Sequence, residues 1–226
     1  TCIDVEAGAA HAVALRSDGS VVCWGLNDFG QCDVPADLGP CIQVAAGALF
    51  TIVVKADGTL GCWGGSGPHD VPEFPIPCVQ TDGGNTFAVA LTDDGVITCW
   101  GDNAQGQCDV PEDLGPCLGM ASGSFHMVAI QADGTIVCWG ANGTGQCDVP
   151  ADLGPCLQVS SRGTHTVALI GDGVHGDLDG DGSVTGADLG LLLAAWGDCP
   201  SCAADLNGDG TVDGGDLGIL LGLWTR

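Results

Sequence analysis

The sequence has little positive charge. Its 226 residues include four Lys and Arg residues against 29 Asp and Glu, and it contains no tyrosine. The formal net charge of −25 argues against nucleic acid and anionic membrane surfaces as ligands, because both are held by Lys and Arg. The same charge suits metal cations and a salty exterior. A solvated, self-repelling surface is the alternative explanation of the acidity.

Sequence signatures of catalysis are also missing. The chain has no nucleophile elbow, no phosphate-binding glycine loop and no distinctive pair of acid and base carboxylates. We therefore expect no enzyme activity, no catalytic residue and no organic cofactor. Neither a signal peptide nor a transmembrane run is visible, and residue 1 is Thr rather than Met. We expect a processed or trimmed product that does not insert into a membrane.

Cysteine, by contrast, is abundant, with 14 residues. So many thiols do not suit a reducing cytosol unless a metal takes them. A zinc site needs two close pairs, and here only Cys199 and Cys202 form one. Disulfides are the better explanation, and they predict an extracellular or cell-surface location.

One phrase recurs through the first three quarters of the chain. Its clearest copy is Cys-Trp-Gly-Ala-Asn-Gly-Thr-Gly-Gln-Cys-Asp-Val-Pro-Ala-Asp-Leu-Gly-Pro-Cys at 138–156; near copies stand at 23–41 and 99–117, and a degraded copy stands at 62–78. Internal repeats of this length decide the architecture. Asp-Gly pairs mark the period, and they begin at Asp18, Asp57, Asp94, Asp133 and Asp172.

Each repeat predicts a small antiparallel meander of about three strands. Asp-Gly between two apolar runs indicates a hairpin, and a two-residue primed turn would require φ > 0. Before the first pair lies a strand at 11–15, and after it lies a strand at 21–25 that ends in Cys-Trp-Gly. A third short strand precedes both, as at 42–45. Units of this kind indicate propeller blades or a β-solenoid.

The phrase resembles the regulator-of-chromosome-condensation type of propeller repeat. The matching pattern is Val-Ala-Ala-Gly, then Val-Ala-Leu-Arg-x-Asp-Gly-x-Val-x-Cys-Trp-Gly-x-Asn-x-x-Gly-Gln. Its period is similar to that of the shorter variety, found in a secreted β-lactamase inhibitory protein. The resemblance implies a ring of seven blades that binds proteins through loops on one face. This chain offers four complete blades and a partial fifth, so either it is a fragment or other chains complete the arc.

Two repeat positions have a predicted packing role. The tryptophan after each Cys is expected in the core or between blades, and a ligand-stacking role is the alternative. The position before Val-Ala-Leu alternates between His and Phe, which favours packing over catalysis or metal binding. Arg162 replaces a repeat glycine and has no evident chemistry. These positions are Trp24, Trp63, Trp100 and Trp139, and His11, Phe50, Phe87, His126 and His165.

The cysteine connectivity is open between two schemes. Pairing each Cys before Trp with the next strand-opening Cys gives 23–41, 62–78, 99–117 and 138–156. We favour this scheme because the second repeat has lost its loop cysteine without leaving an orphan. The rival scheme, 32–41, 108–117 and 147–156, leaves Cys78 without a partner. Sequence alone does not fix disulfide connectivity.

Composition shifts at 171–176, which divides the chain into a repeat domain, 1–174, and an acidic domain, 175–226. The second domain holds two loops, 177–188 and 205–216, with oxygen-bearing residues at positions 1, 3, 5, 7, 9 and 12 and Gly at position 6. This spacing meets the requirement of a calcium loop. The predicted ligands are Asp177, Asp179, Asp181, Ser183, Thr185 and Asp188 for one Ca²⁺, and Asp205, Asn207, Asp209, Thr211, Asp213 and Asp216 for the other, with Ser183 and Thr211 acting through backbone carbonyls.

An amphipathic helix is predicted after each loop. Apolar residues follow i, i+3, i+4, i+7 spacing in both helices, as Leu189, Leu192, Leu193 and Trp196, and as Leu217, Leu220, Leu221 and Trp224. The duplicated loop-then-helix resembles a type I dockerin module. That resemblance implies two calcium ions and docking to a cohesin domain, although Gly186-Ala187 and Gly214-Gly215 are smaller than the usual recognition residues. Cys199 and Cys202 are expected to form a local disulfide.

Three classes of function follow. The first is a secreted, non-catalytic interaction protein whose propeller loops bind a partner and whose tail docks to a cohesin-like domain. The second is a self-assembling structural subunit, a homo-oligomer or filament in a fibre or surface layer, with blades completed between sister subunits. An unpaired strand edge motivates it, because such an edge invites strand addition. The third, less favoured, is a carbohydrate-active enzyme.

Overall fold

The structure is a computed structural model that describes residues 1–65, 67–68, 70–151, 153–170, 176–179, 183–199, 202–207 and 210–224. The chain divides into two compact units, Thr1–Leu169 and Ile170–Arg226, and each is described by itself. The first unit is almost entirely β and the second carries two short helices.

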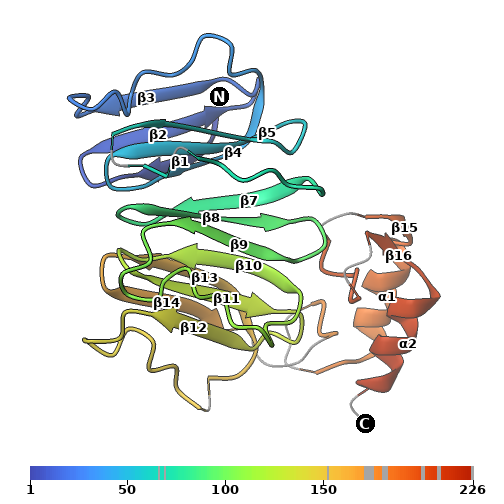
Figure 1. Cartoon of the computed structure of the whole chain (residues 1–226). Helices are drawn as coiled ribbons and strands as arrows, with labels where there is room; N and C mark the ends of the chain where they lie inside the picture. The colour runs from blue at the N-terminus through green and yellow to red at the C-terminus, as the bar shows by residue number, and fades with distance from the viewer. Residues whose placement is uncertain are drawn as a thin grey trace. The chain divides into compact units, whose positions relative to one another are not determined.

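The first unit consists of four three-stranded sheets and a two-stranded fifth, which follow one another in chain order (Figure 1). We call them blades 1 to 5. All strand pairs within the three-stranded blades are antiparallel. The predicted count of four complete blades and a partial fifth is confirmed for the described residues. The strands are β1 Cys2–Ala7, β2 His11–Arg16, β3 Val21–Gly25, β4 Cys41–Ala46, β5 Phe50–Lys55, β6 Leu60–Gly64, β7 Cys78–Gly83, β8 Phe87–Thr92, β9 Ile97–Gly101, β10 Cys117–Ser122, β11 His126–Gln131, β12 Ile136–Gly140, β13 Cys156–Arg162 and β14 His165–Ile170.

The Asp-Gly turns join second and third strands as predicted, but the predicted two-residue primed turn is wrong. In blade 1, Gly19 has φ +80° and no residue other than glycine has positive φ among those described. The Gly19 N–H donates to the Arg16 carbonyl, and the Arg16 N–H donates to the Ser20 carbonyl. This is a three-residue loop with glycine in the left-handed position. The fifth pair, at 172–173, lies outside the described residues.

Each Asp-Gly turn also binds the next blade. The Gly19 carbonyl accepts the backbone N–H of Cys41 at 2.9 Å, and the equivalent bond recurs at the three later turns. The strand-opening cysteines Cys41, Cys78, Cys117 and Cys156 are buried there. The contact joins the start of each of these strands to the turn of the preceding blade.

Four of the five residues at the alternating His and Phe position pack between blades, which confirms the predicted role for them, whereas His165 is exposed. Phe50 and Phe87 are fully buried, and His11 and His126 are at most 4% exposed. The ring of Phe87 lies over Gly84, where an added Cβ would overlap it. The same holds for each of the other three rings and the glycine three residues before it. The glycine that closes the first strand is therefore required by the ring that packs on it.

The repeated tryptophans join neighbouring blades. The indole N–H of Trp63 donates to the Gln31 carbonyl of blade 1 at 3.1 Å, and that of Trp139 donates to the Gln107 carbonyl of blade 3 at 3.0 Å. Both side chains are buried. Trp24 in blade 1 is 51% exposed. The indole N–H of Trp100 likewise donates to the Pro68 carbonyl at 3.0 Å, so the predicted inter-blade role is confirmed for Trp63, Trp100 and Trp139.

The disulfides follow neither predicted scheme. Within single blades, Cys99 bonds Cys108 and Cys138 bonds Cys147, each pair nine residues apart. The loop after Trp-Gly folds back, so that the Cα atoms of each pair lie 5.0 and 5.1 Å apart. The strand-opening cysteines are free thiols, and the four predicted bridges to them are wrong. The prediction assumed that the second repeat, which lacks a loop cysteine, leaves no cysteine of its own unpaired, but Cys62 and Cys78 are both free thiols.

The second unit contains helix α1 Gly186–Ala194, helix α2 Gly214–Gly222 and the short strands β15 Gly197–Asp198 and β16 Thr211–Val212. Its core repeats between the halves, with Val184 and Leu192 matching Val212 and Leu220. Cys199 bonds Cys202, which confirms the predicted local disulfide. Neither helix among the described residues is long and apolar enough to span a membrane.

The two predicted apolar stripes are only partly buried. Leu192 and Leu220 are fully buried, but the last residues of each stripe face solvent. Each helix has only nine residues, so the i+7 tryptophan falls beyond its last turn. The exposed stripe residues are Leu193, Trp196, Leu221 and Trp224, with exposures of 51, 50, 51 and 38%.

Candidate functional site

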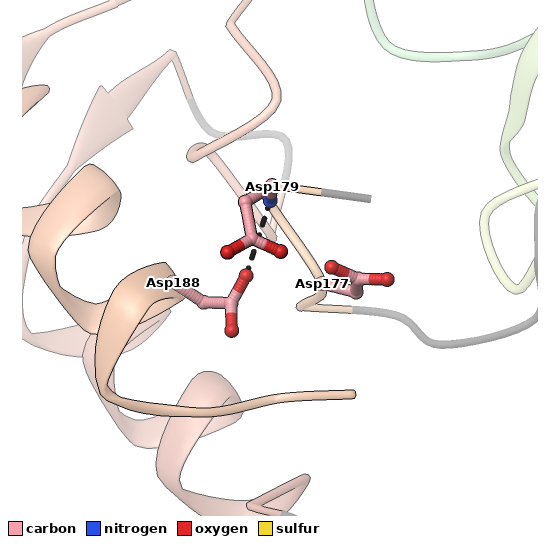
Figure 2. A group of neighbouring side chains, drawn as sticks. All are labelled: Asp177, Asp179 and Asp188. Atoms are coloured by element: carbon pink, nitrogen blue, oxygen red, sulfur yellow. Dashed lines mark hydrogen bonds between the residues drawn. The ribbon is translucent and has the colours of Figure 1, made fainter. Parts of the chain in front are cut away.

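The first acidic loop brings three predicted calcium ligands together at the start of α1. Carboxylate oxygens of Asp177, Asp179 and Asp188 all lie within 4.8 Å of one another. Figure 2 shows Asp177 and Asp179, from the loop, near Asp188, from the first turn of α1. Three like charges at this spacing repel one another unless a cation or protons join them.

Asp188 is held by the loop backbone. Its carboxylate accepts the Thr185 N–H at 2.7 Å, the Leu178 N–H at 2.6 Å and the Asp179 N–H at 3.1 Å. The bond from Thr185, followed by those from Leu178 and Asp179, outweighs burial and lowers the pKa of Asp188. The carboxylate is therefore kept charged and is fixed in position against the loop.

The second loop repeats this arrangement. Asp216 accepts backbone N–H groups from Leu206 at 2.7 Å, Asn207 at 3.1 Å and Asp213 at 2.8 Å. Burial acts to raise the pKa of Asp216, but the three backbone bonds lower it overall. The carboxylate at position 12 of both loops is thus a preformed anchor between loop and helix.

Both helices begin with a capping box that the sequence analysis missed. Thr185 caps α1 and Asp213 caps α2, and each side chain accepts the backbone N–H two residues further on. Asp188 and Asp216 complete the boxes by accepting the N–H of the cap residue. The spacing of a capping residue three positions before an acidic residue was visible in the sequence. Positions 9 and 12 therefore have a structural role besides any metal binding.

The structure gives fewer contacts for the other predicted calcium ligands. Asp205 accepts the Gly210 N–H at 2.8 Å, within the second loop. Ser183 and Asn207 lie in the described parts of their loops, and Thr211 opens β16. Asp181 and Asp209 lie outside the described residues.

The donor set fits a hard cation. Carboxylate oxygens dominate it, and Ca²⁺ takes 6–8 oxygen ligands in protein loops. The second unit has one basic residue, Arg226 at its end, so the protein itself offers little positive charge to neutralise the loops. If bound, Ca²⁺ would be held by the acidic loop residues and would supply the missing counter-charge.

In the propeller unit, the loops after Trp-Gly form a repeated array. We define the Trp–Gly loops as residues 26–32, 102–108 and 141–147. In the first of them, Asn27 accepts the Cys32 N–H at 2.8 Å and donates to Asp33 at 2.7 Å. The same two bonds are made by Asn103 in the second loop, at 2.8 and 2.7 Å, and by Asn142 in the third, at 2.9 and 2.8 Å. The loops are therefore built alike and are stiffened by their own side chains.

The Trp–Gly loops present an acidic surface. The exposed acidic residues in or beside them are Asp28, Asp33, Asp102, Asp109 and Asp148. No Lys or Arg occurs between residues 56 and 161. Phe29 adds an apolar side chain that is 54% exposed at the tip of the first loop. This surface suits a partner that offers basic groups.

Arg162 has a contact that its sequence position did not indicate. Its guanidinium donates to the Ala46 carbonyl of blade 2 at 3.0 Å, across 116 residues of chain. With Glu6 and Asp82 it lines a cavity of about 380 Å³. Burial raises the pKa of the Asp82 carboxyl, and burial followed by the charge of Asp82 raises the pKa of Glu6. The positive charge of Arg162 acts to lower the pKa of both groups, and so it stabilises their charged carboxylate form.

Comparison with a family model identifies the repeats. Residues 2–31, 78–107 and 119–146 match the Regulator of chromosome condensation (RCC1) repeat. These segments fall in blades 1, 3 and 4, which are therefore similar to RCC1 repeats in sequence. No curated protein matches the chain.

Several solved propellers are similar in fold. Yeast RCC1 (Prp20) bound to Kap60 superposes with a TM-score of 0.65 at 21% identity over 76% of this chain and 54% of that one. Human WBSCR16 superposes with a TM-score of 0.65 at 20% identity over 75% of this chain and 57% of that one. The ectodomain of the Arabidopsis thaliana receptor kinase ACR4 superposes with a TM-score of 0.58 at 20% identity over 75% of this chain and 61% of that one. The chain spans little more than half of the first of these structures, and the likeness establishes an RCC1-like propeller fold.

Proposed function

We propose that the chain is a secreted, non-catalytic interaction protein with two binding units. The propeller unit binds a protein partner through the acidic Trp–Gly loops. The second unit is a dockerin-like module that binds two Ca²⁺ ions and docks to a cohesin-like domain of another protein. RCC1-like propellers provide the precedent for protein binding, since Prp20 was solved with Kap60 and was described as binding Gsp1p and histones.

The observation that carries the proposal is the uniform construction of the Trp–Gly loops. Three blades present the same hydrogen-bonded loop with exposed carboxylates, and none of the three loops contains Lys or Arg. A loop that serves only as a connection has no need of such regularity, whereas a binding face gains from preorganisation.

The second unit supports docking in a different way. It exposes Leu193 and Trp196 after the first loop and Leu221 and Trp224 at the same positions after the second. Aromatic and aliphatic side chains of this size are typical anchors in protein interfaces. Calcium would order the loops that begin these helices, and docking would then depend on the ion.

A binding experiment tests both parts. Isothermal titration of the full chain with cohesin domains should show binding in Ca²⁺ that disappears in EDTA and in the variant Trp196→Ala/Trp224→Ala. The propeller is tested with a basic peptide array, using Asp28→Asn/Asp102→Asn as the variant and Asp93→Asn/Asp198→Asn, at two exposed carboxylates outside the loops, as the charge-matched control. Equal peptide binding by both variants would overturn the assignment of the loop face.

Self-assembly is the second candidate function. Strand β1 exposes Ile3 and Val5, and strand β14 exposes Val167 and Leu169, all by more than half. Apolar sheet faces of this kind can pack on another copy. Light scattering that shows a concentration-dependent series of oligomers would favour this function.

The side-chain hydrogen bonds between neighbouring blades give a reason to rank self-assembly second. His11 bonds the Thr51 hydroxyl of the next blade at 3.1 Å, and His126 bonds the Thr166 hydroxyl at 2.9 Å. If blade 5 packed on blade 1 of a second copy, His165 would meet Ala12 instead of Thr. The contact that joins blades within the chain would then be lost between copies.

A further inference from the structure

The third strand of blade 1 places a cysteine where blades 3 and 4 place a bridged one. Cys23 pairs in register with Val13, as Cys99 does with Val89 and Cys138 with Val128. Nine residues later stands Cys32, the same separation that joins both bridged pairs. The strand register of the three blades is therefore the same at this position.

The loop between the two cysteines also has the bridged geometry. Gly30 takes φ +76°, against +73° and +78° at the matching glycines of the bridged loops. The Cys32 thiol lies 3.4 Å from the Leu26 carbonyl, and the matching Sγ atoms of the bridged loops lie 3.7 and 4.0 Å from the equivalent carbonyl. The Asn27 bonds described above complete the match. The backbone of blade 1 is thus already shaped to bring the two sulfur atoms together.

Both cysteines of blade 1 are free thiols in the structure. Burial raises the pKa of Cys23 to about 11, and the neighbouring Cys32 adds to that shift. Burial also raises the pKa of Cys32. Since the thiolate is the attacking species, oxidation should be slow at neutral pH and faster at higher pH.

We propose that Cys23 and Cys32 form a third disulfide of the same type, which closes the first Trp–Gly loop. The oxidant is a small-molecule disulfide such as oxidised glutathione. One protein thiolate attacks it and releases one glutathione, and the second protein thiol then displaces the other glutathione. The two protein thiols are oxidised, one S–S bond forms in the protein, and the small-molecule disulfide is reduced to two thiols. All three loops of the array would then carry the same covalent closure.

Blade 2 supplies an internal control. Cys62 occupies the same register position, opposite Ile52, but no cysteine follows it nine residues later. Burial raises its pKa to about 12. Cys62 should therefore stay a thiol under conditions that oxidise blade 1. The eight free thiols, Cys2, Cys23, Cys32, Cys41, Cys62, Cys78, Cys117 and Cys156, should fall to six.

Peptide mapping of the full chain tests the proposal. The protein is oxidised with glutathione, alkylated under denaturing conditions and cleaved on the N-terminal side of Asp. Peptides 18–27 and 28–32 should be recovered as one disulfide-linked species, and six cysteines should be alkylated. The bridged loop of blade 3 serves as a positive control, because peptides 94–101 and 102–108 should be linked in the same digest.

Two variants separate the possible outcomes. Cys32→Ser should abolish the linked species and raise the alkylated count to seven, whereas Cys62→Ser should keep the link and lower the count to five. Eight alkylated cysteines in the oxidised parent protein would overturn the proposal, and so would a link from Cys23 to any residue other than Cys32. The parent protein gives both of these results without any variant having to fold.

Discussion

His11 and His126 are buried histidines that replace the phenylalanines of the intervening blades. Each uses one ring nitrogen to bond a threonine of the next blade. The other ring nitrogen, Nδ1, is buried without a hydrogen-bond partner. Burial lowers the pKa of both, and the charge of Arg162 lowers that of His11 further. The neutral imidazole is therefore the form that the folded propeller accepts.

The free energy of unfolding should fall as these two histidines are protonated. Their folded pKa lies below the unfolded value of about 6.5, so their contribution is fully present above that value and is lost as the pH falls toward the folded pKa. Each histidine contributes a slope of at most about 1.4 kcal/mol per pH unit. Urea unfolding at several values between about pH 5 and about pH 8 measures this slope.

The variant His126→Phe should flatten that dependence. The repeat itself shows that phenylalanine fits this position, because Phe50 and Phe87 stand there in blades 2 and 3. The Ser161 hydroxyl lies 2.9 Å from Nε2 of His126, and it can still donate to the His165 carbonyl when the imidazole is removed. Replacing the exposed His165 with Gln is the control. An unchanged pH slope in the Phe variant would show that His126 does not carry the effect.

Gly84 is a second residue whose identity is set by its neighbour. An alanine there would place its Cβ in the ring of the fully buried Phe87. Overpacking of this kind costs about 1–3 kcal/mol. Gly84→Ala should therefore lower the urea midpoint, whereas Gly119→Ala should have little effect, because the only atom within 4 Å of its added Cβ is the Gln80 side-chain oxygen at 3.9 Å. Equal stability of the two variants would contradict this account of the repeat glycine.

At the scale of elements, the two acidic loops should act as separate calcium sites. Asp179→Asn removes one carboxylate from the cluster with Asp177 and Asp188, and calcium affinity depends on the number of charged ligands. We expect calorimetry to show one site weakened by about tenfold or more and the other retained. Asp198→Asn, in β15, is the charge-matched control. Loss of both sites in the Asp179 variant would mean that the loops bind the two ions as one cooperative unit.

The blades were predictable from the sequence because their strands are defined by local signals. Asp-Gly pairs and alternating apolar residues placed the hairpins, and the observed β2 and β3 begin at the predicted His11 and Val21. The turn type was not predictable in the same way. The Asp-Gly pair serves both primed and bulged turns, and the strand pairing around it decides between them.

Contacts between distant residues were not predictable. The bond from Arg162 to the Ala46 carbonyl joins residues in blades 5 and 2, and no periodic pattern encodes it. The prediction of the disulfide connectivity was wrong for a related reason. Cys99 is followed by Cys108 and, at twice that separation along the chain, by Cys117, and only the folding of the Trp–Gly loop selects the first.

At the scale of the whole molecule, the two units are stabilised by different means. The propeller has an extensive buried core, inter-blade hydrogen bonds and disulfides within blades. The second unit has a small core of five buried residues and two loops rich in carboxylates. Charge repulsion in those loops opposes folding, and a short helix recovers little by itself. Binding energy from the metal would then be folding energy for the second unit alone.

Hydrogen exchange of the intact chain, read by mass spectrometry during a calcium titration, tests this division most directly. Protection should appear in peptides from 176–224 as Ca²⁺ is added and should vanish with EDTA. Peptides from 1–169 should exchange at the same rate throughout, because the propeller does not depend on the ion. Equal protection of 176–224 with and without Ca²⁺ would contradict calcium-coupled folding of the second unit, and a calcium response in 1–169 would contradict the independence of the two units.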